Sequence, residues 1–415
     1  MTKITKIRAE EIKDSRENPT IKVTVSVGDV SDSFSVPSGA STGAHEMYVL
    51  ETKEVIRKVD EIITPALVGK NIFDQKGIDR IMIELDGTSN KNNLGGNSMI
   101  GVSIACVKVA AKVSGLETFE YLRTLAEILP RSSGRGKTSR RTPYLFMNLI
   151  EGGKHTENNI AFQEYLVVPD TENVTEAVDI GIKIQNTLKE IIIKELGKES
   201  VVLGFEGGFA PKISDIRKPL LYLSETIKQN NLQNKVRLAM DVAASSFFEN
   251  GMYKIVDPEN NRGINGQNIS KEGLMNIYNS LISEFNLLSI EDPFEEEDFE
   301  SFKNLKENHK SFFTVGDDLT VTNVLLLKEA IEKGSINAMI IKPNQIGTLS
   351  ETLETMKLAR ENNIELIVSH RSGETNDDFI VDLAYAFGCF GLKAGAPQKA
   401  ERMLKYKRLI EISKL

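Results

Sequence analysis

Six short apolar runs in the second half of the chain each end abruptly in a polar side chain: VRLAMDVA, LLSIEDPF, FFTVGDDL, NAMIIKPNQ, IELIVSHRS and CFGLKAGAP. Their first polar residues stand at positions 241, 291, 317, 342, 370 and 393, so the successive steps are 50, 26, 25, 28 and 23 residues. One strand, one helix and two short loops take about 25 residues. The spacing therefore indicates successive βα units, with an additional element inside the 50-residue step.

These runs have the composition of parallel strands, since strands buried on both faces are continuously apolar rather than alternating. Amphipathic stretches such as TNVLLLKEAIEKG lie between most of them and predict the connecting helices. A (β/α)-barrel is the simplest closure of such units, and its catalytic groups lie at the C-terminal ends of the strands. A doubly wound sheet is the alternative, but no GxGxxG opens a helix after the first strand.

Residues 1–140 have a different pattern. TIKVTVSVGD alternates apolar and polar residues and VSDSFSVPSG follows it at once, which predicts a β-hairpin. VIRKVDEIITPALVG and NSMIGVSIACVKVAAKVSG have helical periodicity. We expect an α+β domain over residues 1–140 and a barrel domain over residues 141–415. The basic stretch at 131–141, RSSGRGKTSRR, is interpreted as a solvated interdomain loop in preference to a nucleic-acid or membrane contact.

The composition is that of a globular protein with more than one core: 415 residues, 40% hydrophobic and 27% charged, with no Trp. The net charge of −8 argues against a general nucleic-acid-binding role. No apolar run approaches the length of a bilayer span, and the N-terminus is too polar for a signal peptide. Cys106 and Cys389 lie in apolar contexts and match no ligand spacing, so we predict two buried thiols and a cytoplasmic location.

Three carboxylates, Asp241, Glu291 and Asp317, close three successive predicted strands. In a barrel these strand ends meet at one mouth, where the charges would repel one another unless a hard divalent cation lay between them. Any one of them alone would be read as an ordinary helix N-cap. Three carboxylates at equivalent positions favour a metal site.

The next strand ends supply Lys342, then His370, Arg371 and Ser372, then Lys393. A lysine near bound cations has its ammonium form disfavoured and can act as a base near neutral pH. Adjacent Arg and Ser side chains suit a phosphate, although structural salt bridges remain an alternative for Arg371 and Lys393. Together these residue types predict proton abstraction next to a metal-bound carboxylate in a phosphorylated substrate.

Short motifs along almost the whole chain resemble those of the enolase (phosphopyruvate hydratase) family. They run from DSRENPT (14–20) to AERMLKY (400–406) and include PSGASTG (37–43), FQEYLVVP (162–169), GFEGGFAP (204–211), SIEDPF (289–294), IKPNQIGTLSET (341–352), SHRSGET (369–375) and LKAGAP (392–397). The resemblance implies a small α+β domain on a modified (β/α)8, TIM-like barrel. It also implies Mg²⁺-dependent dehydration of 2-phosphoglycerate to phosphoenolpyruvate in glycolysis and gluconeogenesis, with two Mg²⁺ per active site.

The resemblance assigns a role to each candidate residue. The first Mg²⁺ would be held by Asp241, Glu291 and Asp317, and the second through Ser41 in the mobile PSGASTG loop. The catalytic residues would be Lys342 as base at C2, Glu206 as acid at the C3 hydroxyl, Glu164 beside the leaving group and His155 closing over the substrate. The remaining substrate contacts would be Arg371 and Ser372 to phosphate, Lys393 to the carboxylate and His370 in the pocket wall.

Several positions depart from the family pattern. The family has Gly at Glu17, Asp at Phe205 and Asn at Glu151. Replacing Asp by Phe beside Glu206 could raise the pKa of that acid by desolvation or reshape its turn, and the sequence does not decide between these effects.

The departures keep two alternatives to an enolase open: an enolase-like paralogue with a different acid-sugar substrate, or a non-catalytic binding role. Every candidate catalytic position is nevertheless intact, which favours the enzyme. We expect a homodimer or a higher homo-oligomer, with no nucleic-acid partner. At the edge of the expected dimer interface the charges are exchanged, since Lys22 and Glu411 each carry a charge opposite in sign to that of the family residue.

Overall fold

The computed structural model describes residues 2–39, 43–126, 142–156, 160–255 and 267–415. The first part of the chain forms a three-stranded antiparallel sheet in the order β1 (Lys6–Lys13), β2 (Pro19–Val27) and β3 (Val30–Ser35). Burial alternates along β2, as the sequence pattern predicts for a half-buried strand. The predicted hairpin is therefore β2–β3, and β1, which had no prediction, extends the sheet on the other side of β2.

One face of this sheet is covered by helices: α1 (Thr52–Lys58), a π-helical turn (Val59–Ile63), α2 (Thr64–Leu67), α3 (Gln75–Asp86), α4 (Gly96–Val113) and α5 (Thr118–Leu125). The central helix α4 packs on β2 and β3 and is followed by Gly115 with φ +68°, which suits the residue just beyond a helix end. Within the described residues, α4 is the one helix long and apolar enough to cross a membrane, contrary to the expectation that no run approaches that length. Since 78% of its apolar window is buried inside the protein, it is a core helix.

The second part is a closed eight-stranded barrel, which confirms the predicted fold class and excludes the doubly wound sheet. The ring order is β10-β11-β12-β13-β14-β4-β5-β6. The strands are β4 (Tyr144–Glu151), β5 (Glu164–Pro169), β6 (Val236–Asp241), β10 (Ser289–Glu291), β11 (Phe313–Gly316), β12 (Ala338–Ile341), β13 (Glu365–Ser369) and β14 (Gly391–Lys393). Strand β5 pairs antiparallel with both β4 and β6, so the barrel is not the uniform series of parallel βα units that the spacing alone suggests.

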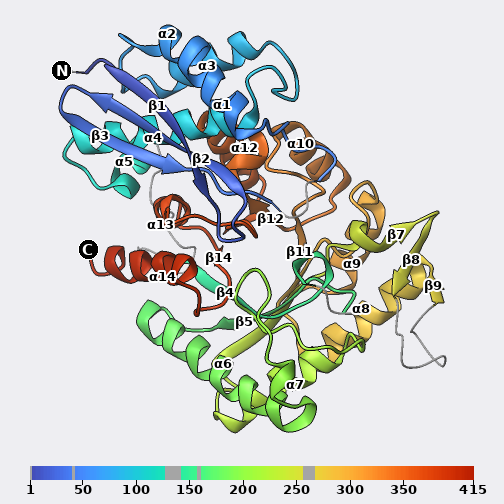
Figure 1. The fold of residues 1–415 in the computed structure, drawn as a ribbon. Helices are drawn as coiled ribbons and strands as arrows, with labels where there is room; N and C mark the ends of the chain where they lie inside the picture. Colours follow the sequence, from blue (N-terminus) through green and yellow to red (C-terminus); the bar gives the residue numbers. More distant parts are fainter. Residues whose placement is uncertain (1, 40–42, 127–141, 157–159, 256–266) are drawn as a thin grey trace.

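Helices surround the barrel, with α6 and α7 below it and α14 near the chain terminus in Figure 1. They are α6 (Val174–Leu196), α7 (Lys218–Gln229), α8 (Lys271–Phe285), α9 (Phe299–Asn308), α10 (Val324–Lys333), α11 (Pro343–Ile346), α12 (Leu349–Glu361), α13 (Phe379–Ala386) and α14 (Ala400–Ile412). The additional element expected in the 50-residue step is present. It is a small sheet of β7 (Phe248–Glu249), β8 (Met252–Ile255) and β9 (Gln267–Ile269), which precedes the connecting helix α8.

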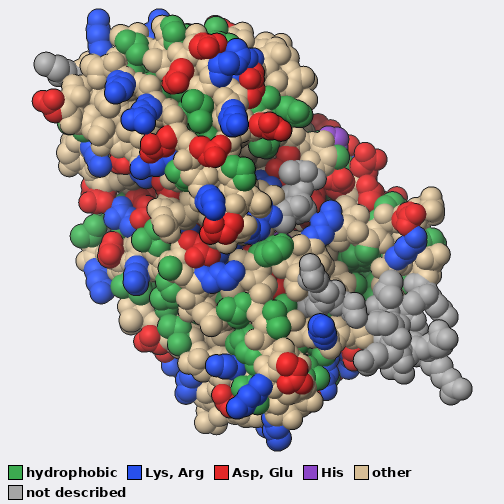
Figure 2. Space-filling model, viewed as in Figure 1, with side chains coloured by type: hydrophobic (Ala, Val, Ile, Leu, Met, Phe, Trp, Pro, Cys, Tyr) green, Lys and Arg blue, Asp and Glu red, His purple; other side chains and the backbone are tan. Residues whose placement is uncertain are grey.

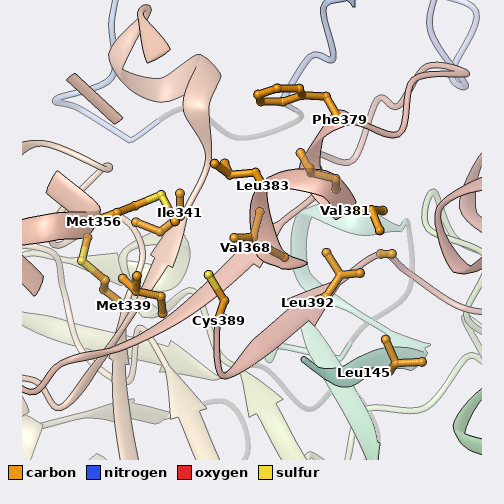
Figure 3. Close-up of a cluster of buried hydrophobic side chains, with 14 of the residues drawn as sticks. Leu145, Met339, Ile341, Met356, Val368, Phe379, Val381, Leu383, Cys389 and Leu392 are labelled. Atoms are coloured by element: carbon orange, nitrogen blue, oxygen red, sulfur yellow. The ribbon is translucent and has the colours of Figure 1, made fainter. Parts of the chain in front are cut away.

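Alternate residues of each barrel strand face two different cores. Along β12, Ala338 and Ile340 point into the barrel interior. Met339 and Ile341 point outward and pack with residues such as Met356 of α12, as Figure 3 shows. Because both faces of the strand are buried in apolar surroundings, the sequence is continuously apolar at these positions.

The two parts pack against each other through α3, α4 and α5 on one side and α11, α12 and α13 on the other. Backbone hydrogen bonds join Ser38 and Gly373, next to the barrel mouth. The predicted boundary between residues 140 and 141 falls in 127–141, outside the described residues, as does the basic stretch. Charged side chains of both signs are interspersed over the face in Figure 2.

Both cysteines are buried and form no disulfide, as predicted.

Candidate active site

One cavity at the carboxyl ends of the barrel strands collects most of the candidate residues, with about 450 Å³ of space including its open mouth. Ten of them line it: His155, Glu164, Glu206, Asp241, Asp317, Lys342, His370, Arg371, Ser372 and Lys393. Glu291, at the end of β10, lies against Lys393. Ser41 lies outside the described residues.

Lys393 lies in the middle of the carboxylate cluster. Its Nζ is 2.8 Å from Glu291, 3.1 Å from Glu164 and 3.2 Å from Asp241. Burial lowers the pKa of Lys393, but the charges of these carboxylates outweigh burial and raise it above its usual value. One ammonium cannot neutralise three buried carboxylates, so the cluster still carries excess negative charge.

Glu291 shows that the cluster fits a divalent cation. Its Oε1 atom is buried and, within the described part of the chain, has no hydrogen-bond partner. Burial and the charge of Asp241 raise the pKa of Glu291 well above its usual value. A set of hard carboxylate oxygens with one unsatisfied atom matches the ligands that Mg²⁺ prefers, so Asp241 and Glu291, which share Lys393, fit the metal role. A second acidic group, Asp292, Asp317 and Asp318, has ligand atoms within 4.8 Å of one another.

Lys342 follows β12 directly and contacts the carboxylate of Asp317 through Nζ. Burial lowers the pKa of Lys342, but the charges of Asp317 and Glu291 raise it, and the net pKa lies above the usual value, so the protein groups alone keep this lysine protonated. The expected low-pKa lysine therefore depends on cations and is not produced by the protein alone. Gln345 also donates to Asp317, at 3.0 Å, and holds its other oxygen.

The proposed phosphate side is built on Arg371. Its guanidinium donates two hydrogen bonds to Glu46, at 2.9 and 3.1 Å, and one to Asn344 at 3.2 Å. Side chains of both Arg371 and Glu46 are buried. Glu46 therefore occupies the bidentate face that a phosphate would use, and a bound phosphate must replace this carboxylate on Arg371.

Glu206 is held by three side chains from separate elements. Asn148 Nδ2 donates to Oε2 at 3.1 Å, and His370 Nε2 lies 3.3 Å from the same oxygen. His155 Nδ1 lies 3.8 Å from Oε1. Arg402, fully buried on α14, contacts Nδ1 of His370.

Arg402 decides the tautomer of His370, because a guanidinium can only donate. Nδ1 of His370 must then accept, which leaves its proton on Nε2, facing Glu206. Burial lowers the pKa of His370 to about 4, so the ring is neutral at pH 7 and acts on Glu206 as a donor. Oε2 of Glu206 thus receives two hydrogen bonds, and Oε1 is the oxygen free to carry a proton.

The pKa of Glu206 reflects opposing effects. Burial raises it, but His370, His155 and Arg402 together lower it, and the net pKa lies well below the usual value. The protein groups in the cavity therefore favour the ionised form of Glu206. A group that must donate a proton needs a compensating negative charge nearby.

Phe205 does not desolvate Glu206. Its side chain is 38% exposed and lies against the guanidinium of Arg16, with Cζ 5.8 Å from the ring centroid. Arg16 also donates to Ser38 and Gly39, at 3.0 and 3.1 Å. The Phe205 side chain therefore points outward, against Arg16, which contacts the described part of the PSGASTG segment.

Backbone strain gathers at the strand ends. Ala243, Asp292, Val321 and Thr322 follow β6, β10 and β11 and have φ of +48°, +42°, +38° and +57°. Each such residue costs on the order of 1–3 kcal/mol and persists only where the surroundings hold it, as is typical of active sites.

Comparison with known proteins agrees with this geometry. The family model of the enolase N-terminal domain matches residues 4–122, and that of the enolase C-terminal TIM barrel domain matches residues 140–414. The chain belongs to the enolase family. It is 40% identical to the enolases of Methanopyrus kandleri and Methanocaldococcus jannaschii, covering 99% and 98% of this chain and 96% and 94% of the relatives. Identity to the enolase of Corynebacterium kroppenstedtii is 38%, covering 99% of this chain and 95% of the relative.

Several residues of this enolase-family site were missed from the sequence. Glu46, Asn148 and Arg402 each bind a candidate residue but lie far from it along the chain. Asp292 accepts backbone N–H bonds from Asp317 and Asp318, at 2.9 and 2.8 Å. The Glu-Asp and Asp-Asp pairs in SIEDPF and VGDDL were a signal for this group, because each placed a second carboxylate beside a predicted ligand.

Proposed function

We propose that this enolase-family chain is a phosphopyruvate hydratase, a hydro-lyase that interconverts 2-phosphoglycerate and phosphoenolpyruvate. The observation that carries the proposal is the placement of Lys342, Glu206 and Arg371 around one cavity with the carboxylate cluster. In the ring order β12 and β5 are four strands apart in an eight-stranded barrel, so Lys342 after β12 faces Glu164 at the start of β5. A base and an acidic group can thus flank one substrate.

Lys342 would remove the proton from C2 of the substrate through its Nζ. This step needs the neutral amine, whereas Asp317 alone favours the ammonium form. Asp317 is also a proposed metal ligand, and a carboxylate shared with a cation holds a neighbouring ammonium less strongly. Mg²⁺ held by Asp241, Glu291 and Asp317, with a second ion held through Ser41, would offset the charge that develops on the substrate carboxylate.

Glu206 would donate its proton from Oε1 to the C3 hydroxyl. The C3–O bond breaks, water leaves, and a double bond forms between C2 and C3. Glu164 and His155 lie on the same side, with His155 Nδ1 3.7 Å from Glu164, and would orient the leaving water. In the reverse direction, Glu206 would accept the proton from water.

The remaining residues would bind the substrate. Arg371 and Ser372 would hold the phosphate once Glu46 is replaced, and His370 would complete that wall. Lys393 would bind the substrate carboxylate next to the metal ligands, which its place among three carboxylates supports. The same cavity therefore carries a phosphate end and a carboxylate end.

We also propose a cytoplasmic homodimer, or a higher homo-oligomer, that acts in glycolysis and gluconeogenesis. Lys22, expected at the dimer rim, lies 3.7 Å from Glu10 of the same chain. Glu10 thus offers Lys22 an internal counter-charge besides Glu411 of a second copy. Sedimentation at micromolar concentration tests this part, and a monomer would contradict it.

The test of the activity is the absorbance of phosphoenolpyruvate formed from 2-phosphoglycerate with Mg²⁺. We expect a steady signal that EDTA abolishes and fresh Mg²⁺ restores. Phosphate-free glycerate serves as the control substrate and should give no product, because Arg371 then lacks its ligand. Well-folded protein without an EDTA-sensitive signal would contradict the proposal and favour another acid sugar or a binding role.

A further inference from the structure

The guanidinium of Arg371 is already paired with an internal carboxylate, that of Glu46. Nη1 donates to Oε2 at 2.9 Å and Nη2 donates to Oε1 at 3.1 Å, which makes the pair bidentate. Nη1 also donates to Asn344 at 3.2 Å. Only 5% and 7% of the two side chains are exposed, and Glu46 itself lines the catalytic cavity. The carboxylate therefore lies where the phosphate of a substrate would meet Arg371.

A third donor holds the same carboxylate. The backbone N–H of Gly43 donates to Oε1 of Glu46 at 3.2 Å, and the N–H of Glu46 donates to the carbonyl of Gly43 at 3.1 Å. The next residue is fixed, because Met47 is buried and its N–H donates to the carbonyl of Gln345 at 2.9 Å. Glu46 can therefore leave Arg371 by rotation of its side chain while the backbone stays anchored at Met47.

A second cavity adjoins the catalytic cavity at this ion pair, with about 1430 Å³ of space including its open mouth. Gly39, Glu46 and Arg371 line both cavities. The second cavity is also lined by exposed charged side chains, those of Glu11, Glu51 and Lys53. Water therefore reaches this space, and a carboxylate that turns into it from Arg371 exchanges a buried ion pair for hydration.

The charges around Arg371 favour exchange of one anion for another over addition of a second anion. Burial lowers the pKa of Arg371, but the charge of Glu46, followed by those of Asp317 and Asp318, raises it above its usual value. A phosphate dianion added beside all three carboxylates would be repelled by them. Replacement of Glu46 by the phosphate adds one negative charge to this group instead of two. Phosphate also offers three acceptor oxygens, so it can bind Ser372 as well as Arg371.

We propose that Glu46 is an internal competitor for the phosphate subsite: its carboxylate occupies Arg371 in the absence of substrate and turns into the second cavity when a phosphate dianion binds. This inference rests on the proposed function, because it concerns the phosphate end of that substrate. Only molecules in which Glu46 has left Arg371 are competent to bind, so the apparent affinity falls in proportion to their fraction. Glu46 thus sets the affinity for phosphate and keeps the buried Arg371 paired when no substrate is bound.

Glu46→Gln tests the competition with little change in shape. The amide carries no charge and binds the guanidinium more weakly than a carboxylate does, so a larger fraction of the molecules is competent. Methyl phosphate is the probe, because the second pKa of a phosphomonoester is about 6 and the probe is therefore largely a dianion at pH 8. Calorimetry in Mg²⁺ buffer should give a Kd about tenfold lower for the variant than for the wild type.

Steady-state kinetics give a second readout. The phosphate is bound in the substrate and in the transition state alike, so removal of the competitor strengthens both. We expect KM for 2-phosphoglycerate to fall about tenfold. We expect kcat to stay within about threefold of the wild-type value. A residue that only oriented Arg371 would give the opposite result, a higher KM and weaker binding of methyl phosphate.

Two further variants separate competition from stability. Glu46→Asp keeps the charge but is one methylene shorter and cannot hold the same bidentate pair, so its Kd should lie between those of the wild type and Glu46→Gln. Asp382→Asn is the matched control, because Asp382 is also a buried carboxylate that accepts two hydrogen bonds from an arginine, Arg408, at 3.0 and 2.7 Å. Asp382 lies on α13 and is not among the described residues that line either cavity, so this variant should lower Tm without changing the Kd.

An unchanged or higher Kd for methyl phosphate in folded Glu46→Gln would overturn the inference and show that phosphate binds with Glu46 in place. If that variant does not fold, an unchanged or higher Kd in Glu46→Asp would overturn the inference and a lower Kd would support it. Wild-type protein that binds no methyl phosphate and forms no phosphoenolpyruvate would instead contradict the proposed function. The two failures are thus distinguishable.

Discussion

Lys342 and Glu206 reach the same cavity from two different kinds of support. Lys342 follows β12, a central strand whose backbone pairs with β11 and β13 in the barrel. Glu206 lies in a turn closed by an isolated bridge between Leu203 and Phe209. Side chains from distant elements also hold the turn, among them Glu151 from β4 and Lys399, which donates to the carbonyls of Gly204 and Phe205 at 3.0 Å.

The difference indicates how each residue can be tuned. The position of Lys342 is fixed by the backbone pairing of its strand. Its environment therefore changes mainly through neighbouring side chains, here that of Asp317. A turn residue depends on distant side chains for both place and protonation. The acid side of the site can therefore be altered by substitutions outside the cavity, as at positions 151 and 205, while the base side stays the same.

The largest effect is expected for Lys342→Ala. Removing the proposed base should lower kcat by about 10⁴-fold and abolish exchange of the C2 proton, because both need proton transfer at C2. Phosphoenolpyruvate absorbance and deuterium exchange by NMR measure the two. Retained exchange of the C2 proton in Lys342→Ala would show that another residue is the base. The comparison between Lys342 on its strand and Glu206 in its turn would then no longer hold.

Glu206→Gln should affect the acid in the turn without affecting the base that follows β12. Dehydration should fall about 10³-fold because the amide cannot donate a proton to the C3 hydroxyl with the strength of an acid. Exchange at C2 should persist, since Lys342 and its strand are unchanged. Parallel assays of both reactions measure this, with Lys342→Ala as the reference that loses both. Equal loss of the two reactions in Glu206→Gln would show that the acid and base do not act separately.

Removal of the metal should lower the stability of the fold through the carboxylates at the strand ends. Mg²⁺ at 100 times its Kd should stabilise the fold by about 2.7 kcal/mol relative to EDTA, because it offsets the charge of Asp241, Glu291 and Asp317. The pKa of Glu291 is raised in the folded chain, so its protonation stabilises the metal-free fold at low pH, and that stability is lost as pH rises. Mg²⁺ binds the ionised form, so the gain in Tm should be larger at pH 8 than at pH 6. Calorimetry at both pH values measures it, and an equal gain would contradict the role of Glu291.

The smallest effect concerns the turn at 14–18, next to Arg16 and Phe205. Glu17 has φ +63°, a left-handed conformation that costs a non-glycine residue about 1 kcal/mol, and its ion pair with Lys13 at 2.9 Å is exposed. Glu17→Gly should raise stability by about 0.5–1 kcal/mol in urea unfolding and leave kcat unchanged. Asn231→Gly, at φ +57° in another exposed turn, should gain less, because Asn tolerates this conformation better. A loss of activity in Glu17→Gly would mean that the strained turn positions the neighbouring loop.

The barrel strands that end in Asp241, Glu291, Asp317, Lys342 and Lys393 were predictable, since each is a continuous apolar run with a polar residue at its end. The direction of β5 was not, because FQEYLVVP is equally apolar whichever way it runs and its pairing with β4 decides the matter. Strand β1 was missed for a related reason. Its sequence KIRAEEIK is mostly polar, and only pairing with β2 makes it a strand.

The sequence by itself determined the types of group in the site and the strand ends on which they stand, because strand burial follows local periodicity. Tertiary structure decided which groups meet. Arg371 meets Glu46 across 325 positions, and Glu206 meets Glu151 across 55. Such contacts, together with the tautomer of His370 and the oxygen of Glu206 that stays free, depend on how the barrel closes and how the turn folds back. Local sequence patterns carry no information on those distances.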